Sequence, residues 1–172
     1  MTVVIETRRL FLRRQNASDA PFILRLLNDA DFLRFIGDRG VRTLEDAESY
    51  IRDGAVASYA ANGFGLYLVE SKDGGEEVGV CGLLSRDFLE DVDLGFAFLP
   101  EHRRRGYARE AAEATIVFAC EELGLERLTA IVSPGNTASI RLLEGLGFRS
   151  RGPVEHPDGD DVHLYTRELN PQ

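Results

Sequence analysis

The sequence has few of the residues that build metal sites and disulfide frameworks, since its 172 residues include two cysteines and three histidines. Cys81 and Cys120 each stand inside an apolar segment, so we expect buried thiols rather than a disulfide or a metal-binding pair. The histidines at positions 102, 156 and 163 are dispersed along the chain, which argues against a zinc site. We therefore expect no metal.

Long hydrophobic runs and an excess of positive charge are also missing. No apolar run approaches the ~20 residues that a membrane span needs, and the N-terminal residues lack the basic start and apolar middle of a secretory signal. We expect a cytoplasmic location and no membrane partner. The net charge of −9 argues against general nucleic-acid binding. The acidity fits a cationic or amine substrate, and it equally fits a protein that acidic charge keeps soluble.

The apolar pattern predicts one domain, residues 1–172, with no linker or internal repeat. Asn16 and Asp19 offer helix caps, and Thr43 with Asp46 makes an acidic capping box. The expected elements are a strand over 3–13, helices over 16–27, 31–35 and 43–61, strands over 64–70, 77–85 and 92–99, a helix over 107–123, a strand over 128–132, a helix over 136–145, and strands that start at 147 and cover 162–169.

A basic run lies between an apolar strand and an alanine-rich helix. Backbone N–H groups at a helix start are unpaired, and the helix dipole adds partial positive charge there. Gly106 and Ala108 remove side-chain bulk, so a large anion can approach the backbone. The full run is Arg103, Arg104, Arg105, Gly106, Tyr107, Ala108 and Arg109. In an acidic chain this combination indicates a diphosphate site.

The order of elements and three segments resemble the GNAT superfamily of acyl-CoA-dependent N-acetyltransferases. The phosphate-binding signature Arg/Gln-x-x-Gly-x-Gly/Ala is matched by residues 103–108, and strand residues 94–101 run straight into it. Residues 136–148 match the Asn-x-x-Ser … Leu-Gly-Phe segment of that superfamily, and the similarity covers nearly the whole chain. The opening residues 6–13 resemble the branch that contains the ribosomal-protein N-terminal-alanine and N-terminal-serine acetyltransferases.

The resemblance implies an α/β (α+β) fold with a mixed, mostly antiparallel central sheet of six to seven strands. It places a V-shaped splay between the fourth and fifth strands, here residues 93–99 and 128–132, and about four helices around the sheet. The splay leaves backbone groups unpaired, and the pantetheine arm of acetyl-CoA can bond to them like an added strand.

Acetyl-CoA is therefore the expected acetyl donor and co-substrate. Arg103 has an alternative role as a brace of its loop, and Asn136 has one as a plain helix cap. The side chains of Phe96 and Phe98 are also expected in the core. The resemblance assigns donor binding to Phe96, Ala97, Phe98, Arg103, Arg104, Arg105, Gly106, Tyr107, Ala108, Arg109, Asn136 and Ser139.

The catalytic candidates are Ser139, Asp93 and Tyr165. The resemblance implies that Ser139 donates a proton to the departing thiolate, although a helix serine is also an ordinary surface residue. Asp93 shares the strand face of Gly95 and is a candidate base or amine anchor, with a solvated strand-end carboxylate as the alternative. Tyr165 is a candidate for orienting substrate or an alternative acid, or a packing residue.

The expected reaction transfers acetyl from acetyl-CoA to a primary amine by direct attack in a ternary complex. A protein N-terminal α-amine is the first-choice acceptor, and an aminoglycoside, polyamine or amino acid is the alternative. A non-catalytic acyl-CoA-binding module is the rival of another class. Phe35, Tyr50 and Phe64 are candidates for the acceptor pocket or for ordinary core. The resembling branch commonly forms homodimers.

Overall fold

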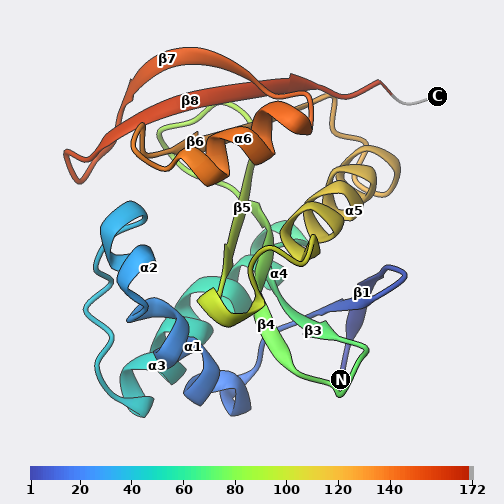
Figure 1. Ribbon diagram of the computed structural model, residues 1–172, viewed down its shortest axis with the longest axis vertical. Helices are drawn as coiled ribbons and strands as arrows, with labels where there is room; N and C mark the ends of the chain where they lie inside the picture. Colours follow the sequence, from blue (N-terminus) through green and yellow to red (C-terminus); the bar gives the residue numbers. More distant parts are fainter. Residues whose placement is uncertain (171–172) are drawn as a thin grey trace.

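The computed structural model describes residues 1–170, and one eight-stranded sheet organises it (Figure 1). The sheet order is β1-β2-β3-β4-β5-β6-β8-β7, and every neighbouring pair is antiparallel except β5 and β6. The strands are β1 (Val3–Glu6), β2 (Leu10–Arg13), β3 (Leu66–Ser71), β4 (Glu77–Leu84), β5 (Asp93–Phe98), β6 (Arg127–Val132), β7 (Arg149–Glu155) and β8 (Asp161–Glu168). The chain therefore has the mixed, mostly antiparallel α/β sheet that the sequence predicted.

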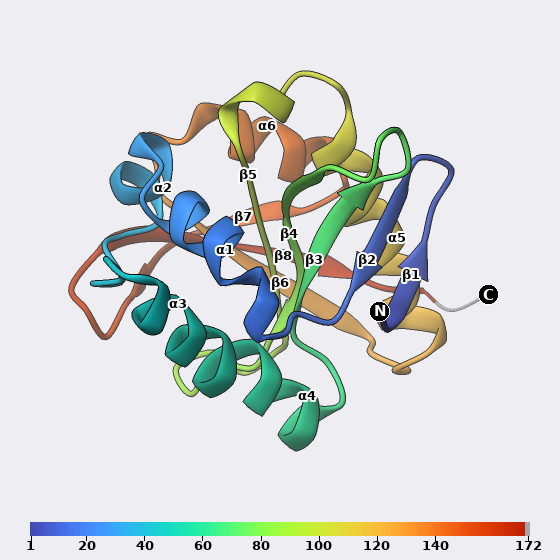
Figure 2. The same ribbon diagram turned by 90° about the horizontal axis from the view of Figure 1, so that it is seen from below.

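Helices cover both faces of this sheet (Figures 1 and 2). On one face, α5 packs into a core that includes Tyr67 and Val69 of β3. On the other face, α1 and α3 pack into a second core that includes Leu68, the residue between them. The α-helices are α1 (Ala20–Leu27), α2 (Ala30–Phe35), α3 (Leu44–Ile51), α4 (Ala57–Asn62), α5 (Tyr107–Glu121) and α6 (Thr137–Gly145). Successive residues of a strand point to opposite faces, so a strand covered on both sides is apolar throughout.

The predicted splay is present between β5 and β6. These two strands share a single register pair, Asp93 with Thr129, and the Thr129 N–H donates to the Val92 carbonyl at 2.9 Å. Beyond this pair the strands diverge, and α6 and the start of α5 lie beside the gap (Figure 1). The splay lies between the fifth and sixth strands rather than the fourth and fifth.

The shift by one strand comes from the N-terminal segment. We predicted one strand over 3–13, and the chain instead forms the hairpin of β1 and β2. The Thr7 N–H donates to the Leu10 carbonyl at 2.9 Å, and the Leu10 N–H donates to Thr7 Oγ1 at 2.9 Å. The turn contains no glycine, proline or asparagine, so the sequence pattern gave no signal of reversal. The sheet consequently has eight strands, not six to seven.

The helices also differ from the expectation of about four. The predicted helix over 43–61 is divided into α3, a π-helical stretch at Arg52–Val56, and α4. Its predicted capping box is confirmed, because Thr43 accepts from the Asp46 N–H and Asp46 accepts from the Thr43 N–H. Within residues 1–170, no helix is both long enough and apolar enough to cross a bilayer.

Candidate active site

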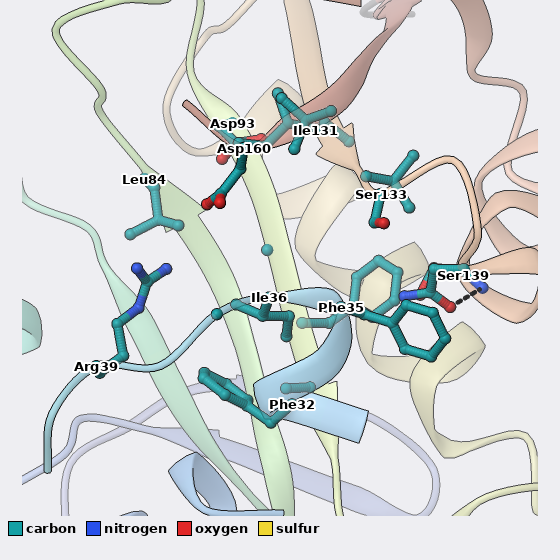
Figure 3. A pocket seen from close by; sticks show the side chains of 18 of the residues that line it. Phe32, Phe35, Ile36, Arg39, Leu84, Asp93, Ile131, Ser133, Ser139 and Asp160 are labelled. Atoms are coloured by element: carbon teal, nitrogen blue, oxygen red, sulfur yellow. Dashed lines mark hydrogen bonds between the residues drawn. The ribbon is translucent and has the colours of Figure 1, made fainter. Parts of the chain in front are cut away.

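A pocket of about 690 Å³ opens where β5 and β6 diverge (Figure 3). Its walls include α2 and the segment after it, the two splayed strands, the start of α6 and the turn between β7 and β8, and α1, α3, β4 and the loop after β4 add further residues. Among the lining residues are Phe32, Phe35, Ile36, Arg39, Tyr50, Arg86, Asp93, Gly95, Phe96, Ala97, Ile131, Ser133, Asn136, Ser139, His156, Asp158 and Asp160. The pocket therefore joins Asp93, Ser139, Asn136, Phe35 and Tyr50, as we expected from the sequence.

Asp93 lies at the point where the splay begins, and its side chain is almost completely buried at 1% exposure. Arg86 Nε donates to Asp93 Oδ2 at 2.7 Å, whereas Oδ1 has no hydrogen-bond partner among the described residues. Burial raises the pKa of the Asp93 carboxyl to about 6, and the Arg86 charge opposes part of that rise. The alternative of a solvated carboxylate is wrong. This group is a buried acid that titrates near neutral pH.

The free edge of β5 faces the splay. The Leu99 N–H donates to the Val78 carbonyl at 3.1 Å, so Ala97 and Gly95 form the next hydrogen-bonded pairs with β4. By this alternation, Phe96 and Phe98 turn their backbone groups toward the splay. The Phe98 carbonyl is taken by Arg103 Nε at 3.0 Å. The backbone of Phe96 and the Phe98 N–H therefore remain available for an extended ligand.

Asn136 and Ser139 lie on the first turn of α6. Asn136 caps this helix, because its Oδ1 accepts the Ser139 N–H at 3.3 Å. Both residues line the pocket, and Figure 3 labels Ser139 at its wall. The Phe35 ring approaches the same corner, where its Cε1 lies 3.9 Å from the position that a Cβ on Gly135 would take. The cap thus fixes the Ser139 backbone at the pocket wall.

Arg103 has a different environment from the two arginines after it. Its guanidinium donates to Asp31 at 2.5 Å and to Asp29 at 3.1 Å, besides the Phe98 carbonyl. These contacts fit the brace that we considered for this residue. Arg104 and Arg105 are exposed and make no ion pair with any residue in the described range 1–170. Two cations beside the start of α5 are therefore free to meet an anionic ligand.

The end of the arginine loop (residues 103–106) has unusual backbone geometry. Arg104 has a φ of 64° and Gly106 a φ of 80°, so left-handed residues alternate along it. Alternation of this kind turns successive N–H groups into an anion-binding concavity. Tyr107 is buried at the start of α5, Ala108 is partly buried, and Arg109 pairs with Glu113 at 2.9 Å. The loop geometry and the charge fit the predicted diphosphate site, which stays a prediction.

Phe98 and the arginine run 103–109 are not among the residues that line the pocket, and one catalytic candidate and one acceptor-pocket candidate also lie elsewhere. Tyr165 is 6% exposed, and it lines a separate cavity between the end of α6 and the start of β7. Phe64 is 8% exposed and belongs to the core on the α5 face. The structure brings neither side chain to the pocket. Their alternatives as packing residues fit their positions, so we do not use them further.

Several pocket residues had no signal in the sequence. Arg86 and Asp160 come from loops on either side of the buried Asp93, and a loop arginine or aspartate is ordinarily solvated. Asp160 also forms a cluster with His156 and Asp158, whose ligand atoms lie within 4.8 Å of one another. The Asp158 N–H donates to His156 Nδ1 at 3.2 Å, and both carboxylates are exposed. These contacts describe a self-bonded turn, and they do not require an ion.

Comparison with known proteins identifies the class that this fold and site define. The acetyltransferase (GNAT) domain family matches residues 9–149, and the chain belongs to that family. An uncharacterized N-acetyltransferase of Bacillus subtilis, YoaA, is 30% identical over 154 residues, which cover 88% of this chain and 86% of YoaA. The chain is thus an acetyl-CoA-dependent N-acetyltransferase.

Two solved structures of acetyltransferases share this fold over almost their whole length. The ribosomal L7/L12 alpha-N-protein acetyltransferase RimL in complex with coenzyme A has a TM-score of 0.83 at 18% identity, and the match covers 97% of this chain and 98% of RimL. The spermidine N-acetyltransferase of Vibrio cholerae in complex with coenzyme A and spermine has a TM-score of 0.77 at 20% identity. That match covers 94% of this chain and 96% of the spermidine enzyme. The fold is therefore shared by enzymes named for different acceptors.

Proposed function

We propose that this protein transfers the acetyl group of acetyl-CoA to a protein N-terminal α-amine, by direct attack in a ternary complex. The observation that carries the proposal is the buried Asp93 carboxylate, with an unpartnered oxygen, at the inner end of a pocket that also contains Ser139. A small-molecule amine is the alternative acceptor, because the acidic turn between β7 and β8 suits any cationic ligand.

The donor side of the site comprises the free edge of β5, which lines the pocket, and the arginine loop and the start of α5, which lie beyond the lining residues. Its groups fit acetyl-CoA, because they offer unpaired backbone along an extended path and then an anion-binding turn with two free arginines. Bound there, acetyl-CoA would supply an activated thioester carbon for attack by an amine. Phe96 would orient the pantetheine arm through backbone bonds, and the N–H groups after Arg105 would hold the diphosphate.

The acceptor side of the pocket comprises α2, the turn between β7 and β8, and Asp93. An amine must be neutral to attack, and an α-amine with a pKa near 8 loses its proton far more readily than a lysine near 10.4. Asp93, ionised above a pH of about 6, would take the excess proton through water. Ser139, on the opposite wall, would donate a proton to the departing thiolate and regain one from water, so that the proton lost by the amine balances the one gained by the thiol.

Acetylation of defined peptides tests the acceptor. Peptides that begin with alanine or serine and carry an internal lysine would be incubated with acetyl-CoA and the protein, beside formyl-blocked copies, spermidine and free amino acids. Mass spectrometry would locate the acetyl group. We expect acetylation at the free α-amine and none on the blocked copy. Faster acetylation of spermidine or an amino acid would replace the first-choice acceptor with the small-molecule alternative.

A further inference from the structure

The turn between β1 and β2 is bonded to the first turn of α5, about a hundred residues away in the sequence. The Glu110 carboxylate accepts three hydrogen bonds from this turn. They come from Thr7 Oγ1 at 2.5 Å, from the Arg9 N–H at 3.0 Å and from Arg9 Nε at 2.7 Å. The turn and the helix start therefore form one connected unit.

The Arg9 guanidinium continues past Glu110 to the end of the arginine loop. Its Nη1 donates to the Arg105 carbonyl at 2.9 Å. Its Nη2 lies 3.1 Å from the position that a Cβ on Gly106 would take, and its central carbon lies 4.8 Å from the centre of the Tyr107 ring. One side chain thus contacts three consecutive residues at the diphosphate site. We had explained Gly106 by the approach of an anion, and Arg9 gives a second reason for the missing side chain.

The contact with the Arg105 carbonyl determines where the next N–H points. The described peptide bonds are all trans, and in a trans peptide the carbonyl and the following N–H point in opposite directions. Holding the Arg105 carbonyl toward Arg9 therefore turns the Gly106 N–H away from the hairpin. That N–H has no acceptor within residues 1–170. The alternating left-handed residues Arg104 and Gly106 keep this peptide in place.

Arg9 also balances the charge of Glu110. A carboxylate at a helix start stabilises the helix dipole, but it repels a diphosphate bound at the same end. Burial raises the pKa of the Glu110 carboxyl, and the hydrogen bonds from Thr7 and Arg9 lower it by more, so this carboxyl stays ionised. The ion pair with Arg9 leaves the site with Arg104 and Arg105 as net positive charge.

We propose that Arg9 is a positioning residue for the diphosphate of acetyl-CoA, acting by holding the Arg105 carbonyl so that the Gly106 N–H is presented to the ligand. Thr7 and Glu110 hold Arg9 in turn. The inference rests on the proposed use of acetyl-CoA at the arginine loop. It adds a contribution from the hairpin, which lies outside the strand, loop and helix that make up the donor side.

Calorimetric titration with acetyl-CoA tests the inference. Arg9→Ala is expected to raise the Kd about tenfold, the usual effect of losing hydrogen bonds that involve a charged group. Arg8→Ala is the matched control, because Arg8 is an exposed neighbour of the same charge. It should change the Kd less than about twofold. Arg9→Lys keeps the charge, but one ammonium cannot replace the guanidinium fork, so it should resemble Arg9→Ala.

A truncated donor separates positioning from a general structural role. S-acetylpantetheine has the thioester and pantetheine arm but no diphosphate, so its kcat/KM should be the same in wild type and in Arg9→Ala. An equal fall with both donors would refute the positioning role, and so would an unchanged Kd for acetyl-CoA in both Arg9 variants. If Arg9→Ala does not fold, Arg9→Lys supports the same comparison. Wild type that fails to bind acetyl-CoA would refute the proposed function, and the inference with it.

Discussion

The donor and acceptor sides of the site are held by different kinds of contact. On the donor side, Arg103 bonds to Asp29, Asp31 and the β5 backbone, and Arg9 bonds to Glu110 and the Arg105 carbonyl. On the acceptor side, the carboxylates of the β7–β8 turn are exposed. The arginine loop is thus held by bonds between distant segments, whereas the β7–β8 turn is an exposed loop whose polar side-chain contacts lie within the turn. The β7–β8 turn can therefore change without altering the contacts that hold Arg103 and Arg9.

The largest expected effect is at the junction of the two sides. Asp93→Asn should lower kcat by about a hundredfold or more while the Kd for acetyl-CoA stays unchanged, because it removes the proton acceptor and leaves the arginine loop intact. Stopped-flow or steady-state measurement of thiol release gives kcat, and calorimetry gives the Kd. An unaltered kcat would exclude Asp93 as the base.

The pH dependence of the same variant follows from the raised pKa. In wild type, kcat should fall as the pH drops through about 6, where Asp93 takes up a proton, and Asp93→Asn should lack this step. The folded chain binds that proton more tightly than an acid of the ordinary pKa, 3.8, so this group's contribution to the free energy of unfolding falls as the pH rises from 3.8 to about 6. Persistence of the kinetic step in the variant would assign it to another group.

The next largest effect is expected on the donor side alone. Gly106→Val should raise the Kd for acetyl-CoA by roughly ten- to a hundredfold, because the residue has a φ of 80° and its Cβ would lie 3.1 Å from Arg9 Nη2. Gly124→Val is the control, since Gly124 has a φ of 67° and open space around it at the far end of α5. Equal weakening of binding in both variants would contradict the diphosphate assignment.

A smaller effect is expected at α6. Ser139→Ala should lower kcat about tenfold and leave the KM for acetyl-CoA nearly unchanged, because the proton is needed only as the thiolate departs. Ser133→Ala is the matched control, since Ser133 lines the same pocket (Figure 3). A kcat equal to wild type in Ser139→Ala would remove this residue from the mechanism.

The smallest effect is expected at the exposed acceptor turn. Asp160→Asn should raise the KM for the amine a few-fold without changing the KM for acetyl-CoA, because an exposed carboxylate attracts a cation only weakly. Asp53→Asn, at an exposed aspartate of the π-helical stretch and outside the pocket lining, should change neither constant. If Asp160→Asn changed the KM for acetyl-CoA and left the KM for the amine unchanged, the assignment of this turn to the acceptor side would be wrong.

The sequence predicted the parts of this molecule that depend on local pattern. The helix caps and the face of β5 that carries Asp93 follow from capping residues and from alternation close together in the chain, whereas the splay was expected from the family resemblance. Motif residues 103–108 and 136–139 likewise predicted the loop and helix that border the pocket. The β1–β2 reversal was missed, because its turn is closed by Thr7 rather than by a residue typical of turns.

Local sequence patterns could not predict contacts between distant segments of the chain. The partners that turn Arg103 into a brace, Asp29 and Asp31, lie more than seventy residues before it. The burial of Asp93 depends on the strands that meet there, and the position of Tyr165 depends on β8 lying between β6 and β7. The sequence around an aromatic strand residue does not show whether its side chain lines the pocket or a separate cavity, as Tyr165 does.

The release of CoA thiol with and without an amine tests the central claim most directly. At saturating acetyl-CoA, the account predicts negligible thiol release from the protein alone and sustained release when a peptide with a free α-amine is added. It also predicts that the rate of thiol release rises with the concentration of that amine until the amine saturates the protein. Tight binding of acetyl-CoA with no thiol release across peptides, polyamines and amino acids would contradict the account and leave a binding module.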